Sequence, residues 1–126
     1  MEREGGIERR KHPRVKKRLP LKLHDEVFDI VTQTENISCS GAYCEVNRFL
    51  APMTKLNVVM LLPMEHKGKK AVKKIECKGV VVRTEQPQLT EGSQIYKIAI
   101  FFNQINKSDM KKIAEYVSYH LSKDKE

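Results

Sequence analysis

Apolar and polar residues alternate along most of this chain, as they do in strands that bury one face. The alternation is strict at residues 19–23, where three leucines are separated by Pro20 and Lys22. Ser40-Gly41 is a turn signal after the second such segment, and we expect a hairpin loop at 63–70 and a polar loop at 84–94. The pattern predicts six strands, at residues 19–23, 27–37, 42–46, 56–62, 72–83 and 95–102.

The period of the pattern changes near the C-terminus and predicts a helix over residues 106–123. Asn106 can cap this helix together with Asp109, or Ser108 can cap it from a later start. The helix is expected to pack on the strands through one apolar stripe. The residues of this stripe follow helical spacing: Met110, Ile113, Ala114, Val117 and Leu121.

Six short strands and one terminal helix predict an all-β barrel or sandwich. A length of 126 residues fits one domain. The longest apolar run, residues 58–63, is too short to span a membrane, and the N-terminus lacks the apolar stretch of a secretory signal. We therefore expect a cytoplasmic protein without a membrane span.

Cysteine and histidine spacing gives no sign of a metal site or a disulfide framework. The three cysteines, Cys39, Cys44 and Cys77, are odd in number and lack CxxC spacing. Reduced thiols in the cytoplasm are the simplest interpretation. The four histidines show no paired ligand spacing, so we expect no metal.

The net charge of +8, from 24 Lys+Arg against 16 Asp+Glu, is unevenly distributed. Residues 1–24 contain nine basic and three acidic side chains, so most of the excess lies near the N-terminus. We interpret residues 1–14 as a flexible basic arm. Such an arm commonly meets phosphate, although a merely solvated tail is the alternative. The lysine-rich stretch 67–78 is interpreted as a solvated hairpin.

Two short motifs contain the candidate binding residues. The first is an RxxxR formed by Arg10 and Arg14, and the second is an NxSxxG formed by Asn36, Ser38 and Gly41. Arg14 and Arg18 share the RxxxR spacing. We prefer the pair Arg10 and Arg14, because Arg18 falls in the alternating segment whereas a flexible arm can wrap a ligand.

These residue types suit a purine nucleotide with phosphate. Arginine presents a rigid fork of donors to phosphate or to the guanine O6/N7 edge. Asn36 can pair with a base edge, and a serine hydroxyl can donate to phosphate. Gly41 allows close approach of a ligand or a positive φ at the strand end. Neither motif contains a nucleophile with a base and an orienting partner, so binding is favoured over catalysis and no enzyme is expected.

With these motifs, the sequence resembles the PilZ domain family, bacterial receptors for the second messenger cyclic di-GMP. The resemblance covers residues 9–121 and rests on ERRKHPRVKKRLPLKL, NISCSGAYCEV, GVVVR and YKIAIFF. It implies a six-stranded antiparallel β-barrel over 15–105 with a C-terminal α-helix. It also implies a ligand pocket on the barrel exterior, closed by the N-terminal arm.

The resemblance also assigns roles to residues. It implies that Arg14 grips the guanine edge and that Arg10 contacts phosphate or stacks on a base. The NxSxxG residues Asn36, Ser38 and Gly41 would line the barrel side of the pocket, with Asn in place of the commoner Asp. Two further ligand-binding candidates are Arg9, which resembles an extra basic position of the family, and Ser40.

Two hypotheses follow. The first is a stand-alone cyclic di-GMP receptor, without a cofactor, that relays the signal to an unidentified partner protein when the ligand orders the arm. The second is a small basic barrel that binds RNA or single-stranded DNA. Aromatic residues are only 6% with no Trp, and this scarcity of stacking platforms disfavours nucleic acid. The sequence does not indicate which cellular process, motility, biofilm formation or adhesion, the protein would control.

Overall fold

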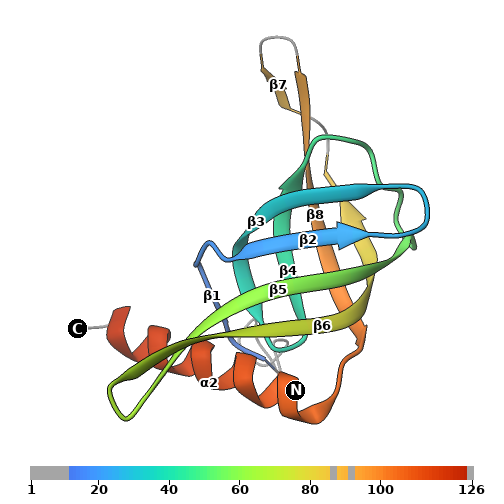
Figure 1. The fold of residues 1–126 in the computed structure, drawn as a ribbon. Coiled ribbons are helices and arrows are strands. Elements are labelled where there is room, and N and C mark those ends of the chain that lie inside the picture. Colours follow the sequence, from blue (N-terminus) through green and yellow to red (C-terminus); the bar gives the residue numbers. More distant parts are fainter. Residues whose placement is uncertain (1–11, 86–87, 91–92, 125–126) are drawn as a thin grey trace, which may run out of the picture.

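The computed structural model describes residues 12–85, 88–90 and 93–124 (Figure 1). The strands and the helix occur along the chain in the order β1 (Arg14–Val15), β2 (Pro20–His24), β3 (Asp29–Ser38), β4 (Gly41–Val46), β5 (Lys55–His66), β6 (Lys69–Thr84), β7 (Gln88–Thr90), β8 (Ser93–Gln104) and α2 (Lys107–Asp124).

Six strands close into a barrel. The order of hydrogen-bonded neighbours is β3-β2-β5-β6-β8-β4, and β4 returns to β3 through a further pairing. Every pairing is antiparallel. The short strands β1 and β7 add to β3 and β8 respectively. The predicted all-β fold, a six-stranded antiparallel barrel followed by a C-terminal helix, is confirmed.

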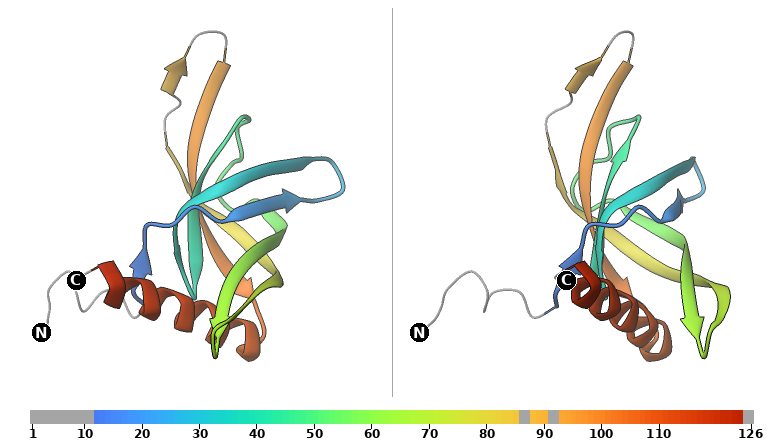
Figure 2. Two further views of the ribbon diagram at one scale, coloured as in Figure 1. Left: turned by 60° about the vertical axis from the view of Figure 1, so that its left-hand side comes forward. Right: turned by 90° about the vertical axis from the view of Figure 1, so that its left-hand side faces the viewer.

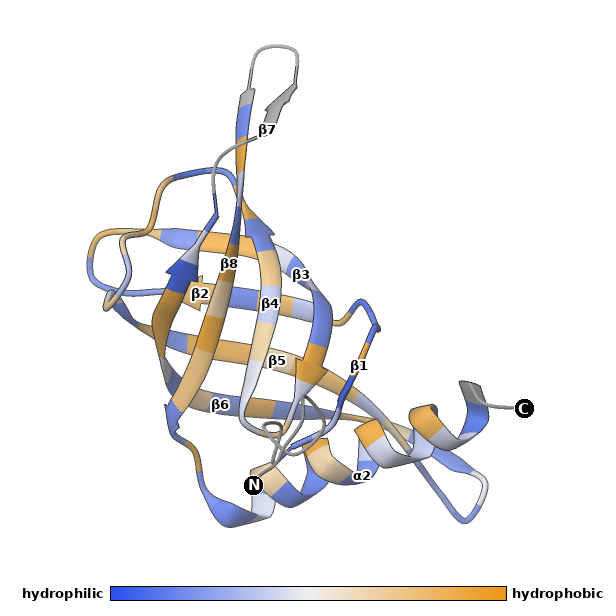
Figure 3. Ribbon diagram, turned by 180° about the vertical axis from the view of Figure 1, so that it is seen from behind, coloured by the Kyte–Doolittle hydropathy of each residue, from blue (hydrophilic) through white to orange (hydrophobic). Residues whose placement is uncertain are grey.

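Hydrophobic and hydrophilic residues form bands along the strands (Figure 3), and the apolar positions of the alternating pattern form one buried core. The side chains of Leu21, Leu23, Met60 and Ile98 are almost completely buried. Burial of such side chains is worth about 1.5–3 kcal/mol each, so the interior of the barrel is the main source of stability.

Helix α2 lies across one end of the barrel, next to β1, β3 and β5 (Figures 1 and 2). Ile113 and Val117 are buried, as the helical stripe predicted. The stripe was wrong at Ala114, which is exposed, whereas Tyr116 is 7% exposed and packs inward instead. No helix in the described part of the chain is long and apolar enough to cross a membrane.

Asn106 caps α2 in the way that the sequence predicted. Its side-chain oxygen accepts a hydrogen bond from the backbone N–H of Asp109 at 2.7 Å, and its amide donates to the Asp109 carboxylate at 3.1 Å. The alternative cap is not used, because the Ser108 hydroxyl accepts a hydrogen bond from Lys112 at 3.2 Å. Helix α2 therefore begins at Lys107.

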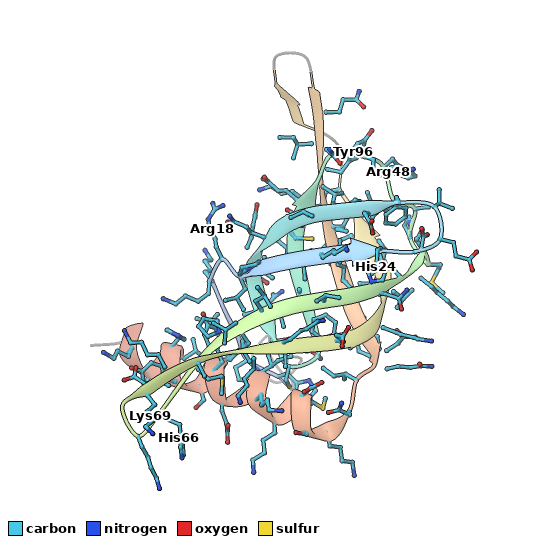
Figure 4. All side chains as sticks on the ribbon, viewed as in Figure 1. Arg18, His24, Arg48, His66, Lys69 and Tyr96 are labelled. Carbon is cyan, nitrogen blue, oxygen red and sulfur yellow. The ribbon has the colours of Figure 1, made fainter. Side chains whose placement is uncertain are left out.

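The predicted loop 63–70 is wrong. Strands β5 and β6 pair as far as His66 and Lys69, and only Lys67-Gly68, both with positive φ, forms the turn. The extended hairpin projects past α2, with His66 and Lys69 at its tip (Figure 4). Pro63 is tolerated because this part of β5 has a strand neighbour on one side only, and such edges accommodate proline.

The predicted polar loop 84–94 is also wrong in part. Residues 88–90 form β7, which pairs with the first residues of β8 from Ser93 to Ile95. This small hairpin projects from the end of the barrel opposite α2 (Figure 2). Its residues are mostly polar, and polarity alone does not distinguish such a hairpin from a loop.

Candidate functional site

A β-bulge in β3 turns the NxSxxG side chains to the outside of the barrel. Thr34 is completely buried, so strict alternation would also place Asn36 inside. The register of β3 against β4 shifts between Thr34 and Asn36, which leaves Glu35 as an extra residue. Beyond the bulge Ile37 points into the core, and Asn36 and Ser38 lie on the opposite face. Bulges commonly re-aim side chains in this way next to functional sites.

Strand β1 brings Arg14, the second arginine of the RxxxR motif, to the same place. Arg14 is the direct partner of Ser38 in the β1–β3 pairing, and Gly41 is the partner of Ser38 across the β3–β4 hairpin. Gly41 is in turn paired with Phe101 of β8. Arg14 is exposed, whereas Ser38 is 6% exposed. Arg14 of the first motif thus meets the second motif at one end of β1.

A cleft of about 520 Å³ opens between these strands. It brings together Arg14, Asn36, Ser38, Gly41 and the further candidate Ser40. Arg9 and Arg10, and with them most of the predicted arm 1–14, lie outside the described residues. The described part begins at His12, and the predicted boundary between arm and barrel at 14/15 falls inside β1. The cleft is lined by His12, Arg14, Asn36, Ser38, Ser40, Gly41, Ala42, Tyr43, Val82, Ala99, Ile100 and Phe101.

Hydrogen bonds of the Ser38 side chain hold the β3–β4 hairpin that forms the floor of this cleft. The Ser38 hydroxyl accepts a hydrogen bond from the backbone N–H of Ser40 at 3.2 Å, and the hydroxyl oxygens of Ser38 and Ser40 lie 3.1 Å apart. Serine bonds of this kind stabilise turns. Ser38 therefore shapes the hairpin in addition to facing the cleft.

Gly41 is explained by strand packing. A Cβ at this position would overlap the carbonyl oxygen of Ile100 in β8. Among the described glycines only Gly68 has a positive φ, so of the two alternatives for Gly41, close approach of a ligand or a positive φ, the second is wrong. The missing side chain lets β4 and β8 approach closely at the floor of the cleft.

A second bulge, in β6, presents residues that the motifs did not include. The register of β6 against β8 shifts between Val81 and Arg83, which leaves Val82 as the extra residue. Val81 is fully buried, whereas Val82 is 53% exposed and faces the cleft. The consecutive valines ahead of Arg83 could have indicated this bulge in the sequence, because they break the strict alternation of apolar and polar residues.

A smaller cleft of about 310 Å³ adjoins the first one, with which it shares Arg14, Asn36 and Tyr43. Lys16 and Arg83 complete its lining. The sequence analysis missed Lys16, Tyr43, Val82, Arg83 and Phe101, since they belong to neither motif and only the fold brings them to the site.

Tyr43 and Arg83 form a connected group with Glu85. The Arg83 Nε lies 3.5 Å from a Glu85 carboxylate oxygen, and the Arg83 guanidinium lies 5.9 Å from the centre of the Tyr43 ring. Burial, followed by a hydrogen bond to Glu85, raises the pKa of Tyr43 to about 12. Tyr43 is therefore a neutral phenol near pH 7, with a ring that can support a cation or a base.

The cysteine thiols are not activated for nucleophilic chemistry. All three are free, and burial raises the pKa of Cys44 and of Cys77 to about 12. Burial also raises the pKa of Cys39. Because the thiolate is the reactive form, these thiols are inert near pH 7.

Comparison with known proteins agrees with this architecture. Among solved structures, the chain is similar to the Bacillus subtilis inhibitor of motility (MotI/DgrA), with a TM-score of 0.78 and 19% identity over 93% of this chain. The chain spans about half, 53%, of the length of that structure. It is also similar to the PilZ domain with c-di-GMP of YcgR from Escherichia coli, with a TM-score of 0.60 and 8% identity, covering 92% of this chain and 96% of that one.

At these identities the two structures establish the shared fold. None of the curated proteins matches the chain in sequence. The sequence profile of the PilZ domain, however, matches residues 8–119, which include both motifs, all the barrel strands and most of α2. The chain therefore belongs to the PilZ domain family.

Proposed function

We propose that this chain is a receptor for cyclic di-GMP, which binds in the larger cleft. The observation that carries the proposal is the meeting of Arg14, Asn36, Ser38 and Gly41 around one cleft, although they come from separate parts of the sequence. A volume of about 520 Å³ lies within the range of small-molecule sites. The similar YcgR domain was solved with c-di-GMP, which supports this choice of ligand.

Each part of the cleft suits one part of the ligand. Arg14 presents its fork of donors to the O6/N7 edge of a guanine. Asn36 offers a carbonyl acceptor and an amide donor to the base. Phe101, which is 47% exposed, and Val82 supply an apolar wall for a purine face. Arg10 and Arg9, from the residues ahead of β1, would contact phosphate. This set of groups binds and orients a nucleotide without a catalytic nucleophile, so we propose a receptor rather than an enzyme.

Binding of the ligand would be communicated to a partner protein through the residues ahead of β1. Helix α2 contacts β1, the strand that bears Arg14. Ligand that orders the N-terminal arm over the cleft would change the surface beside α2, where a partner protein in the cytoplasm could dock. Backbone relaxation of residues 5–16, measured by NMR with and without ligand, tests this step. Equal mobility in both states would refute it.

Calorimetric titration of the full chain with cyclic di-GMP tests the receptor proposal. The informative variant is Arg14→Ala, and Arg18→Ala is the matched control, because Arg18 shares the RxxxR spacing but lines neither cleft. Loss of one bidentate guanine contact, about 1–3 kcal/mol, predicts that Arg14→Ala weakens binding roughly ten- to a hundred-fold. Arg18→Ala should bind like the unmodified chain. No binding by the unmodified chain would refute the proposal.

Salt dependence separates this receptor from a nucleic-acid binder. Neutralisation of many phosphates costs about 10³–10⁵ in affinity between 50 and 200 mM salt. A ligand with two phosphates should show a much shallower slope. Tight, steeply salt-dependent binding of single-stranded DNA or RNA, without binding of cyclic di-GMP, would support the alternative instead.

A further inference from the structure

Three cations converge on the smaller cleft. Arg14, Lys16 and Arg83 line it together with Asn36 and Tyr43, and its lining contains no carboxylate. Within residues 12–85, 88–90 and 93–124, neither Arg14 nor Lys16 forms an ion pair. Like charges concentrated in one concave site repel each other and attract an anion. Within the described residues, Glu85 therefore pairs with Arg83 alone, and Arg14 and Lys16 are left without an acidic partner.

Arg83 is held at the edge of this cleft in a position to bind. The Tyr43 ring lies 5.9 Å from its guanidinium, and Glu85 lies 3.5 Å from its Nε. The Arg83 side chain is nevertheless 61% exposed and that of Glu85 41% exposed. An exposed ion pair of this kind contributes little to stability. Arg83 can therefore exchange Glu85 for a phosphate at small cost, whereas the phosphate gains a charge-assisted, bidentate partner.

We propose that the smaller cleft is an anion subsite, in which Arg83 and Lys16 bind a phosphate of the ligand that occupies the larger cleft. The two clefts share Arg14, Asn36 and Tyr43, so one ligand can reach into both. Tyr43 lines both clefts and, as a neutral phenol near pH 7, does not repel the phosphate. The inference rests on the proposed function and extends it to residues outside the two sequence motifs.

Titration of the full chain with cyclic di-GMP tests the subsite. We expect Arg83→Ala to weaken binding about tenfold or more, and Lys16→Ala to weaken it less, since lysine is a single point charge. The affinity of Arg83→Lys for cyclic di-GMP should lie between those of the unmodified chain and Arg83→Ala. Glu85→Gln should bind more tightly than the unmodified chain, because it removes the carboxylate that competes for Arg83. A merely structural role of the Arg83–Glu85 pair predicts the opposite sign for Glu85→Gln.

Arg48→Ala is the matched control. Arg48 also lies over an aromatic ring, with its guanidinium 4.9 Å from the centre of Phe28, but it belongs to the far end of the barrel from β1 (Figure 4). The affinity of Arg48→Ala for cyclic di-GMP should be within about twofold of that of the unmodified chain. Far-UV circular dichroism should show that each variant is folded.

Three results would overturn the proposal in distinguishable ways. Unchanged affinity in Arg83→Ala, with normal binding by the unmodified chain, refutes the subsite and leaves the receptor proposal intact. A fall in the number of ligands bound, at unchanged affinity, shows that the cleft holds a separate molecule and refutes the shared ligand. No binding by the unmodified chain refutes the receptor and the subsite together.

Discussion

The carbonyl oxygen of Ile100 occupies the space in which a side chain at position 41 would begin. Gly41 starts β4 and Ile100 lies in β8, so this contact joins the two strands where they form the floor of the larger cleft. The glycine of the NxSxxG motif is therefore required by the closure of the barrel itself. This packing constraint holds whether or not Gly41 also contacts a ligand.

Gly41→Ala should destabilise the barrel. The added methyl group meets backbone rather than a movable side chain, and overpacking of this kind typically costs about 1–3 kcal/mol. Urea unfolding followed by circular dichroism measures the loss. The control is Gly68→Asn, because Gly68 has open space around it and Asn tolerates its positive φ of 78°. Equal unfolding midpoints for the two variants would contradict the packing argument.

Thr34 connects the chain leading into β2 to the barrel wall through a fully buried hydroxyl. This hydroxyl accepts a hydrogen bond from the Leu19 N–H at 2.9 Å and donates one to the Lys17 carbonyl at 2.6 Å. Thr34→Val keeps the shape but leaves both backbone groups without this partner. We expect a loss of about 1–3 kcal/mol in the free energy of unfolding.

Thr32→Val provides the comparison for Thr34→Val. The Thr32 hydroxyl makes a single bond, to the Glu45 carbonyl at 2.7 Å, and is only partly buried. Its replacement should cost clearly less than that of Thr34 in the same urea experiment. A Thr34→Val protein as stable as Thr32→Val would show that water satisfies the freed groups.

The sequence predicted the barrel well because its signals are local and periodic. Leucines at alternate positions indicate a strand wherever it lies, and the capping pair Asn106 and Asp109 identifies its helix without any long-range information. The β5–β6 hairpin was underestimated for a related reason. Both faces of its outer part are exposed, so it lacks alternation, and its proline and lysines have the composition of a loop.

Only those site residues that belong to a short sequence motif could be predicted from the sequence. Asn36 and Ser38 were found by spacing, although the bulge at Glu35 that points them outward was not. Arg83 and Tyr43 come from β6 and β4, and only the closed barrel places them beside Arg14. A residue whose role depends on such non-local strand pairing produces no periodic pattern in the sequence. For this reason the smaller cleft was not predicted.

The cap of α2 gives a test with a built-in control. Asn106→Ala removes the acceptor for the Asp109 N–H and should destabilise the protein by about 1 kcal/mol. Ser108→Ala removes only an exposed bond with Lys112 and should be nearly neutral. Thermal unfolding of both variants discriminates the two possible caps. A larger loss for Ser108→Ala would place the start of the helix one residue or more later.

Glu35, the bulge residue of β3, should make stability depend on pH. Burial, then a hydrogen bond and the charge of Glu45, raise the pKa of Glu35 above the ordinary value of 4.5, although Lys97 lies 3.7 Å away and opposes the shift. The folded protein therefore binds this proton more tightly than the unfolded chain does. Stability from this group is fully present below pH 4.5 and is lost as the pH rises through the folded-state pKa.

Glu35→Gln removes that titration, since the amide stays neutral. The free energy of unfolding of the variant, relative to the unmodified chain, should therefore be more favourable at pH 7 than at pH 4, whatever constant difference the amide introduces. Urea unfolding at both values measures this change. Glu115→Gln, on the exposed face of α2, is the control and should show no such change between the two pH values. If the relative stability of Glu35→Gln were the same at pH 4 and pH 7, attraction to Lys97 would balance burial and the charge of Glu45, and if it were more favourable at pH 4, that attraction would outweigh them.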